Sequence, residues 1–140
     1  MPTIDYPLTA AYQPAAGVPL VPVLLVELIR GGQSARAVGV VDSGATITVF
    51  NPEHAEILGI EDVREGQPER VSTQGGPVDY YVFDLEMQIT LNGHTKRFPC
   101  RVGFFESRKP RNILGRNYIF SHYQIGFSET NQEIYLRPEE

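Results

Sequence analysis

The chain has 140 residues, of which 41% are hydrophobic and 21% are charged, as expected for one globular domain with its own apolar core. The formal net charge is −5 and the few Lys and Arg residues are scattered, which argues against nucleic acid as a partner. Cys100 is the single cysteine, so an intrachain disulfide is excluded and a reducing compartment is favoured.

The most apolar stretch of the sequence, residues 18–29, does not have the properties of a membrane segment. It contains Glu27, Pro19 and Pro22, and it is too short to cross a bilayer. It also follows no basic leader and lies too far from the first residue for a signal peptide. We therefore expect a cytoplasmic protein that does not associate with membranes.

The N-terminal segment, residues 1–19, contains four prolines and little periodicity, which predicts an extended arm, although Ile4, Tyr6 and Leu8 alternate like a short edge strand. Residues 20–140 are then expected to form the folded domain. Within it, the aliphatic run 20–29 and the small and β-branched residues 35–41 flank the turn sequence Arg30-Gly31-Gly32-Gln33. This pattern predicts a β-hairpin.

The second strand of this hairpin leads directly into Asp42-Ser43-Gly44-Ala45, and residues 46–50 are again strand-like. β-Branched and aromatic residues favour strands, so Asp42 is expected on a loop between two strands. Asn51 and Pro52 then predict a helix start, with Asn51 as the N-cap, and Gly59 ends a helix of about two turns.

Two further hairpins are predicted in the middle of the chain. Residues 70–83 form two strands around Gly75-Gly76-Pro77, a glycine-rich tip that is able to move. Apolar and polar residues alternate over 85–91, and the strongest turn pair of the sequence, Asn92-Gly93, joins this strand to 98–105. Such alternation is typical of half-buried antiparallel strands.

The C-terminal part combines a loop, a short helix and a last hairpin. The polar loop 106–111 precedes the apolar pair Ile113-Leu114, and a short helical pattern ends at Phe120. Residues 123–127 and 133–136 form the terminal hairpin. The whole pattern predicts an all-β fold of many short strands with one or two short helices.

Asp42 is the first candidate for chemistry, because a strand containing Val40 and Val41 presents it and Gly44 allows a tight turn behind it. Asp-Ser-Gly is also common as a turn in which the aspartate bonds the local backbone. For an isolated match this structural role is the better interpretation. A second feature is needed to decide between the two roles.

The second feature is Asn112-Ile113-Leu114-Gly115-Arg116-Asn117. Together with Val40-Val41-Asp42-Ser43-Gly44-Ala45 it resembles the retropepsins, the retroviral aspartic proteases and their cellular and bacterial relatives. Members place Asp-Thr/Ser-Gly-Ala after an aliphatic strand and later carry two apolar residues, Gly, and Arg-Asn or Arg-Asp at the start of a short helix. Both motifs occur here in that order, and the resemblance covers about residues 20–136.

The resemblance implies a closed, β-barrel-like lobe that works as a homodimer on a peptide or protein substrate, with one Asp42 from each subunit. This chemistry needs a base to activate water and an acid to protonate the substrate. Two carboxylates in contact share a proton, so one plays each part. No metal or other cofactor is implied, because the nucleophile is water.

The family also implies roles for the neighbours of Asp42. Ser43 would link its hydroxyl to the other chain across the dimer axis, Gly44 would contact the substrate backbone, and Ala45 would line the pocket. Many relatives have Thr in place of Ser43, and retroviral relatives often have acidic residues where this chain has Thr46-Ile47. Substrate specificity therefore cannot be transferred.

Two more segments receive a role from the resemblance. Gly75 and Gly76 match the tip of the family's flap above the substrate, although an ordinary hairpin turn fits the same residues. Gly115 lets its segment pass close beneath the Asp42 loop, and Arg116 and Asn117 support that loop. For Arg116, an exposed side chain at a helix start is the alternative.

Other kinds of site find little support. His54, His94 and His122 are dispersed, with no i,i+4 pair or nearby cysteine to form a metal site. Ser43 lacks the Gly-x-Ser-x-Gly surroundings of a serine nucleophile and a histidine base placed by the sequence. Cys100 lies in a predicted strand and is expected to pack as a small apolar residue.

The sequence leaves three hypotheses for function. The first is an aspartic endopeptidase that binds an extended peptide, and the intact Asp42-Ser43-Gly44 favours it. The second is a catalytically silent dimerisation or peptide-binding module with the retropepsin fold, because a fold does not guarantee an activity. The third is a protease whose own arm, residues 1–19, obstructs the cleft or the dimer interface.

Overall fold

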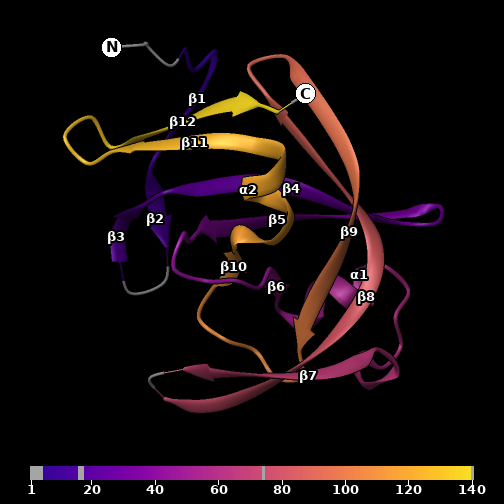
Figure 1. Ribbon diagram of the computed structural model, residues 1–140. Helices are drawn as coiled ribbons and strands as arrows, with labels where there is room; N and C mark the ends of the chain where they lie inside the picture. The colour runs from indigo at the N-terminus through magenta and orange to yellow at the C-terminus, as the bar shows by residue number, and fades with distance from the viewer. Residues whose placement is uncertain (1–4, 16–17, 74, 140) are drawn as a thin grey trace.

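The computed structural model describes residues 5–15, 18–73 and 75–139. Its elements, in chain order, are β1 Leu8–Ala11, β2 Gln13–Ala15, β3 Val18–Val21, β4 Val23–Arg30, β5 Gln33–Val41, β6 Val49–Phe50, α1 Pro52–Ile57, the 3-10 helix η1 Val63–Glu65, β7 Gln67–Thr73, β8 Gly76–Leu91, β9 His94–Phe105, β10 Asn112–Leu114, α2 Arg116–His122, β11 Tyr123–Ser128 and β12 Glu133–Pro138. Strands dominate and the α-helices are short (Figure 1), so the predicted fold class is confirmed.

Six of the strands form a closed ring. Neighbours pair in the order β4, β5, β10, β6, β9 and β8, and β8 returns to β4 through the pairs Glu27↔Gln88, Leu28↔Met87 and Ile29↔Glu86. β7 extends this sheet along β8. Closure gives each ring strand two neighbours and leaves the apolar side chains on one face to fill the interior. The ring agrees with the barrel-like lobe expected from the sequence.

The first hairpin places the candidate aspartate. β4 and β5 pair as far as Arg30↔Gln33, and the turn between them contains Gly31 at a φ of 59°, a conformation that glycine adopts without strain. Beyond the hairpin, β5 also pairs in parallel with β10, ending at Leu114↔Val41. Asp42 follows immediately, so a strand held on both edges presents it.

β8 is a single strand of 16 residues, where the sequence pattern predicted two strands. No turn residue interrupts it, and β9 pairs with it without a break from Tyr80↔Phe105 to Leu91↔His94. At the predicted boundary, Asp84 lies opposite Arg101 and forms an ion pair with it, with 3.2 Å between Oδ1 and Nε. A polar residue in the middle of the strand is thus accommodated by its cross-strand partner.

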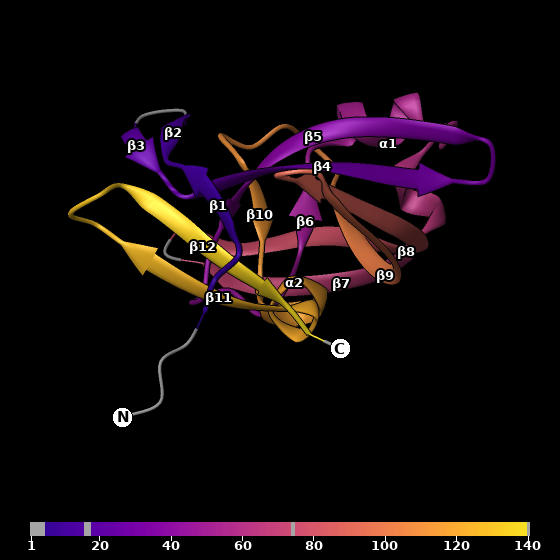
Figure 2. The ribbon, with the colours of Figure 1, turned by 90° about the horizontal axis from the view of Figure 1, so that it is seen from above.

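The N-terminal segment that was expected as an extended arm contains strands. β1 pairs antiparallel with β12, beginning at Leu8↔Leu136, and β2 forms a small hairpin with β3. β12 also pairs with β11, so it is the middle strand of a three-stranded sheet beside the ring (Figure 2). Leu8 and Leu136 are both buried in the core. That residues 1–19 form a unit separate from the domain 20–140 stays a prediction.

The interior consists of two apolar clusters. The larger one combines ring strands, α1, α2 and the three-stranded sheet. It includes Cys100, whose burial raises the pKa of the thiol to about 12, so the predicted apolar role of this residue is confirmed. The smaller one is built on Val49, Tyr80 and Phe105. Several residues of this second cluster line the cleft described below.

Both predicted helices are present, with differences at their ends. Pro52 opens α1 as predicted, but the Asn51 side chain makes no capping bond and is used elsewhere. α2 is interrupted at its start, because Asn117 has a ψ of 121° and Tyr118 a φ of 78°. In the part of the chain that is described, neither helix is long and apolar enough to cross a membrane.

Candidate active site

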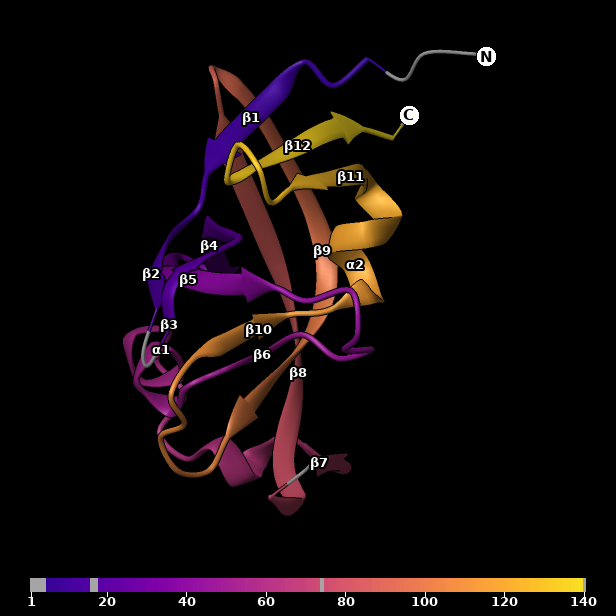
Figure 3. The same cartoon turned by 90° about the vertical axis from the view of Figure 1, so that its left-hand side faces the viewer.

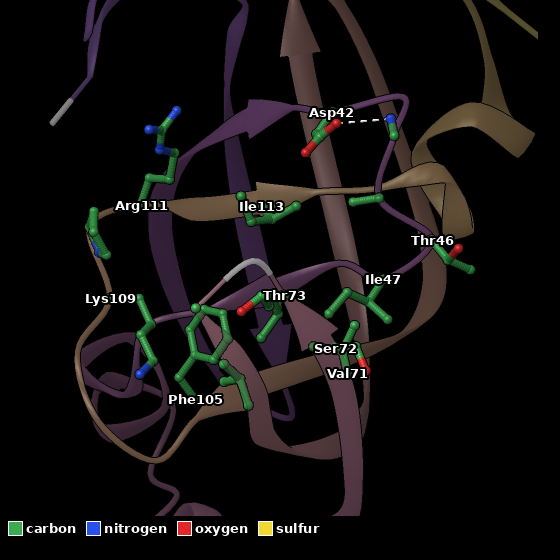
Figure 4. A pocket seen from close by; sticks show the side chains of 16 residues that line it. Asp42, Thr46, Ile47, Val71, Ser72, Thr73, Phe105, Lys109, Arg111 and Ile113 are labelled. Atoms are coloured by element: carbon green, nitrogen blue, oxygen red, sulfur yellow. Dashed lines mark hydrogen bonds between the residues drawn. The ribbon is translucent and has the colours of Figure 1, made fainter. Parts of the chain in front are cut away.

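Asp42 begins a tight turn between β5 and β6. Its backbone N–H donates to the Leu114 carbonyl (3.0 Å), and its own carbonyl accepts from the Ala45 N–H (3.2 Å). The Gly44 N–H donates to Asp42 Oδ1 (2.8 Å), which fixes one carboxylate oxygen (Figure 4). The side chain is half-buried. The local bond expected of a structural turn is therefore present, yet the second oxygen remains available for chemistry.

The segment after β10 passes directly beneath this turn. A Cβ atom on Gly115 would overlap the Ile47 carbonyl oxygen and would lie 2.8 Å from the Ala45 carbonyl oxygen. These are backbone atoms, which cannot move aside as a flexible side chain can. The close approach expected of Gly115 is therefore present, and it requires glycine for space, because its φ of −88° is open to any residue.

Several hydrogen bonds join the two segments. The Arg116 N–H donates to the Ala45 carbonyl (2.8 Å), and the Asn117 N–H donates to the Thr46 carbonyl (3.0 Å). The buried Thr48 hydroxyl accepts from the Gly115 N–H and donates to the Asn117 carbonyl. These bonds fix the distance between the Asp42 turn and the start of α2. Figure 3 shows β10, which leads into this segment, lying beside the antiparallel β6.

The Arg116 side chain is exposed, but it is not without a partner. Its guanidinium donates to Thr46 Oγ1 at 3.0 Å. Thr46 stands where retroviral relatives often have an acidic residue, so a neutral hydroxyl here takes the place of a carboxylate. This hydrogen bond has a charge on the donor only, whereas a carboxylate would add the opposite charge and a second oxygen for bidentate pairing. The support from this side chain is therefore weaker than a carboxylate would give.

A cleft of about 620 Å³ opens beside Asp42. Apolar side chains from the smaller core cluster form much of its floor, and a polar loop forms one side. The lining residues are Asp42, Gly44, Ala45, Thr46, Ile47, Val49, Val71, Ser72, Thr73, Gly75, Val78, Phe105, Lys109, Pro110, Arg111 and Ile113. One carboxylate next to an apolar groove of this size can hold an extended peptide with a bond near the acid.

The cleft brings together four of the predicted site residues, Asp42, Gly44, Ala45 and Gly75. Ser43 is exposed on the same turn without lining the cleft, and Gly115 to Asn117 lie beneath it as support. Gly76 also lies outside the lining. It has a φ of 107°, and its carbonyl accepts from Thr73 Oγ1 (2.6 Å) at the end of the β7–β8 hairpin.

The loop 106–111 is the part of the site that the sequence interpretation missed. It contributes Lys109, Pro110 and Arg111 to the lining. Asn51 holds it, because Oδ1 accepts from the Lys109 N–H (2.6 Å) and Nδ2 donates to the Lys109 carbonyl (3.1 Å). The loop directly precedes the motif at 112–117, and that adjacency was the available signal.

The remaining candidates lie away from Asp42. His54 Nε2 is 3.1 Å from Asn112 Nδ2, and burial lowers the pKa of this histidine. His122 stacks on Phe98, and burial lowers its pKa as well. Within the described residues, no group of three or more His, Cys, Asp or Glu side chains is placed to hold a metal ion. The described part of 1–19 contributes no lining residue to the cleft.

Comparison with known proteins gives the fold and the family. Among solved structures, a retropepsin-like aspartic protease from Rickettsia conorii is similar over 91% of this chain and 98% of that chain, with 13% identity and a TM-score of 0.62. EIAV protease in an inhibitor complex is similar over 69% of this chain and 82% of that chain, with 19% identity and a TM-score of 0.45. No curated protein matches the sequence.

The fold is therefore that of a retropepsin-like lobe. The sequence model described as aspartyl protease matches residues 26–118, more than half of the chain and the stretch that contains both motifs. The chain belongs to the aspartyl protease family. The resemblance stated from the sequence is confirmed, and family and fold together support a protease-like function.

Proposed function

We propose that the protein is an aspartic endopeptidase whose active site forms when two copies pair and bring their Asp42 side chains together. The observation that carries this proposal is the half-buried Asp42 carboxylate at the edge of a peptide-sized apolar cleft. A carboxylate with only a structural turn role has no need of such a cleft. The family match over this segment adds to the argument.

The chemistry explains why two copies are needed. One Asp42 carboxylate takes a proton from water as the oxygen attacks the peptide carbonyl carbon, and the partner's Asp42, protonated, donates to the carbonyl oxygen. Collapse of the tetrahedral intermediate then breaks the C–N bond, and the leaving amine receives a proton. Asp42 is the single acidic residue among the described residues that line the cleft, so one chain supplies half of the pair.

The exposed side of the Asp42 turn supports this assembly. Ser43 and Gly44 are exposed in the single chain, which leaves the Ser43 hydroxyl free to reach a second copy. β12 already has a neighbour from its own chain on each edge. In a dimer in which strands of the two copies also pair, the strand of the second copy would therefore have to add at the outer edge of β1 or β11.

The substrate proposed for the cleft is an extended peptide. The β7–β8 hairpin, with Gly75 near its tip, would cover the peptide, and the floor around Val49, Phe105 and Ile113 would receive apolar side chains. An extended peptide between two such surfaces presents alternate side chains to each of them.

The test is cleavage of a mixed peptide library from about pH 4 to 7, a range that spans carboxyl titration, with the mass of the same samples measured by sedimentation. Asp42→Asn is the control, because its amide oxygen can still accept from the Gly44 N–H. We expect cutting that tracks the dimer and falls by at least about a hundredfold in the variant. A confirmed dimer that cuts nothing across this pH range would instead favour a peptide-binding or dimerisation module.

A further inference from the structure

The charge of the cleft differs in sign from the charge of the chain. The whole chain has a formal net charge of −5, whereas the described residues that line the cleft include two cations, Lys109 and Arg111, and one acid, Asp42. In a homodimer with one shared proton, two such clefts would join four cations with a single negative charge. A site of this kind attracts anionic groups.

Within the described residues, no acid pairs with either of the two cations. Among the ion pairs and side-chain hydrogen bonds of the described residues, neither the Lys109 ammonium nor the Arg111 guanidinium has a partner. The neighbouring Arg108 differs, because it pairs with Glu53 at 2.8 Å. Lys109 and Arg111 are nevertheless half-buried. A half-buried cation without a partner is a good place for a ligand's charge.

The backbone that carries these cations is fixed from both ends. Asn51 is 4% exposed and bonds both the N–H and the carbonyl of Lys109. Asn112, directly after Arg111, accepts from the Asn51 N–H (2.8 Å) and donates to the Val38 carbonyl (2.9 Å). Pro110 between the cations restricts the backbone further. A held loop loses less freedom on binding than a mobile one.

The cations border the apolar floor and lie near the proposed chemistry. Figure 4 shows Lys109 and Arg111 along one side of the pocket, with Thr46 on the opposite side and Ile113 between Arg111 and the Asp42 end. A peptide lying across this floor would pass the cations within a few residues of the bond beside Asp42.

We infer that the cleft selects peptides that carry a Glu or Asp side chain close to the cut and apolar residues around it, with Lys109 and Arg111 as the specificity-determining residues. This inference rests on the proposed function, because it names the substrate class of the same cleft. A carboxylate at the C-terminus of a peptide has the same chemistry, so the test must separate the two sources.

The experiment uses pairs of apolar peptides with blocked ends that differ by Glu or Gln at one internal position, moved in turn along the sequence. Glu is ionised at about pH 6 and has the size of Gln, so the ratio of kcat/KM within a pair isolates the charge. We expect a preference for Glu of about tenfold at the best position, reduced in about 0.5 M NaCl by screening. The same peptides with a free C-terminus form a second series. If the free C-terminus speeds cleavage while the blocked pairs show no preference for Glu, the cations bind the terminal carboxylate and the side-chain inference is overturned.

The matched variants are Lys109→Gln with Arg111→Gln, and Arg36→Gln as control. Arg36 is an exposed residue of β5 outside the cleft lining, so its loss changes the net charge without changing the site. The double variant should bring the Glu/Gln ratio close to one, and Arg36→Gln should leave it unchanged. Circular dichroism shows whether the double variant remains folded.

The outcomes separate this inference from the proposed function. Cutting that depends on Asp42 but shows no Glu preference, or a preference that survives in the folded double variant, overturns the inference alone. If no peptide is cut, the proposed function fails, and binding of the same pairs to Asp42→Asn protein decides the inference. Tighter binding of Glu peptides that the double substitution abolishes supports it, and equal binding overturns it.

Discussion

Gly115→Ala is the sharpest test of how the Asp42 turn is supported. The new Cβ would overlap the Ile47 carbonyl oxygen and would come within 2.7 Å of the Ile47 carbonyl carbon. It would also lie 2.8 Å from the Ala45 carbonyl oxygen, which accepts from the Arg116 N–H. Since every obstacle is backbone, the strain can be relieved only by moving the Asp42 turn away from α2.

The magnitude follows from that geometry. Overpacking in a well-packed interior costs about 1–3 kcal/mol, and rigid backbone obstacles place this case at the upper end. We expect the free energy of unfolding to fall by about 3 kcal/mol. For a domain of this size each kcal/mol lowers Tm by roughly 3–5 °C, which gives a decrease of about 10 °C. Cleavage should fall as well, because the turn that carries Asp42 has to shift.

The measurement is thermal unfolding of the variant beside Gly32→Ala. Gly32 lies in the β4–β5 turn, and a Cβ there would meet nothing within 4 Å. The control should therefore keep the Tm of the wild type to within about 2 °C, as exposed substitutions usually do. If Gly115→Ala melts with the control, the close approach beneath Asp42 does not constrain the fold and the reasoning is refuted.

Two further predictions concern the surroundings of the cleft. Asn51→Leu should lower the free energy of unfolding, measured by urea titration, by about 2 kcal/mol and weaken the Glu preference. The reason is that the N–H and the carbonyl of Lys109 both lose the Asn51 side chain as hydrogen-bond partner. Unchanged stability and preference would contradict this. Burial lowers the pKa of His54 and of His122, so the unfolded chain binds more protons below about pH 6.5 and stability should fall as the pH drops through that range. A His54→Gln, His122→Gln variant should lose less stability from about pH 7 to 5, and an equal loss would assign the effect to other groups.

The parts of the fold that follow local rules could be predicted from the sequence. The turn at Gly31 and the turn at Asn92-Gly93 were located correctly, because turn positions with positive φ favour Gly and Asn, which can be recognised in the sequence. The long β8 was divided in two, since the cross-strand partner that accommodates Asp84 is Arg101 on another strand. Local composition does not show which distant segments pair with each other.

The site shows the same division. Asp42 and Gly115 could be singled out as candidates because each belongs to a compact motif, and the motifs occur in order. The role of Asn51 could not, because the residue has the local properties of an N-cap while its side chain bonds Lys109, 58 positions along the chain. Likewise, Tyr118 at a φ of 78° interrupts a segment whose composition is helical.

The proposed chemistry and the stability of the fold together restrict the pH range in which cleavage is expected. A pair of carboxylates acts as base and acid only while it retains one proton, which favours acidic conditions. A glutamate in the substrate binds Lys109 and Arg111 as a charged group only above its ordinary pKa of about 4.3. Below about pH 6.5, the two partly buried histidines, whose pKa burial lowers, begin to cost stability. Cleavage of acidic peptides should therefore be best supported between about pH 5 and 6.5, where substrate charge, a shared proton and a stable fold coexist.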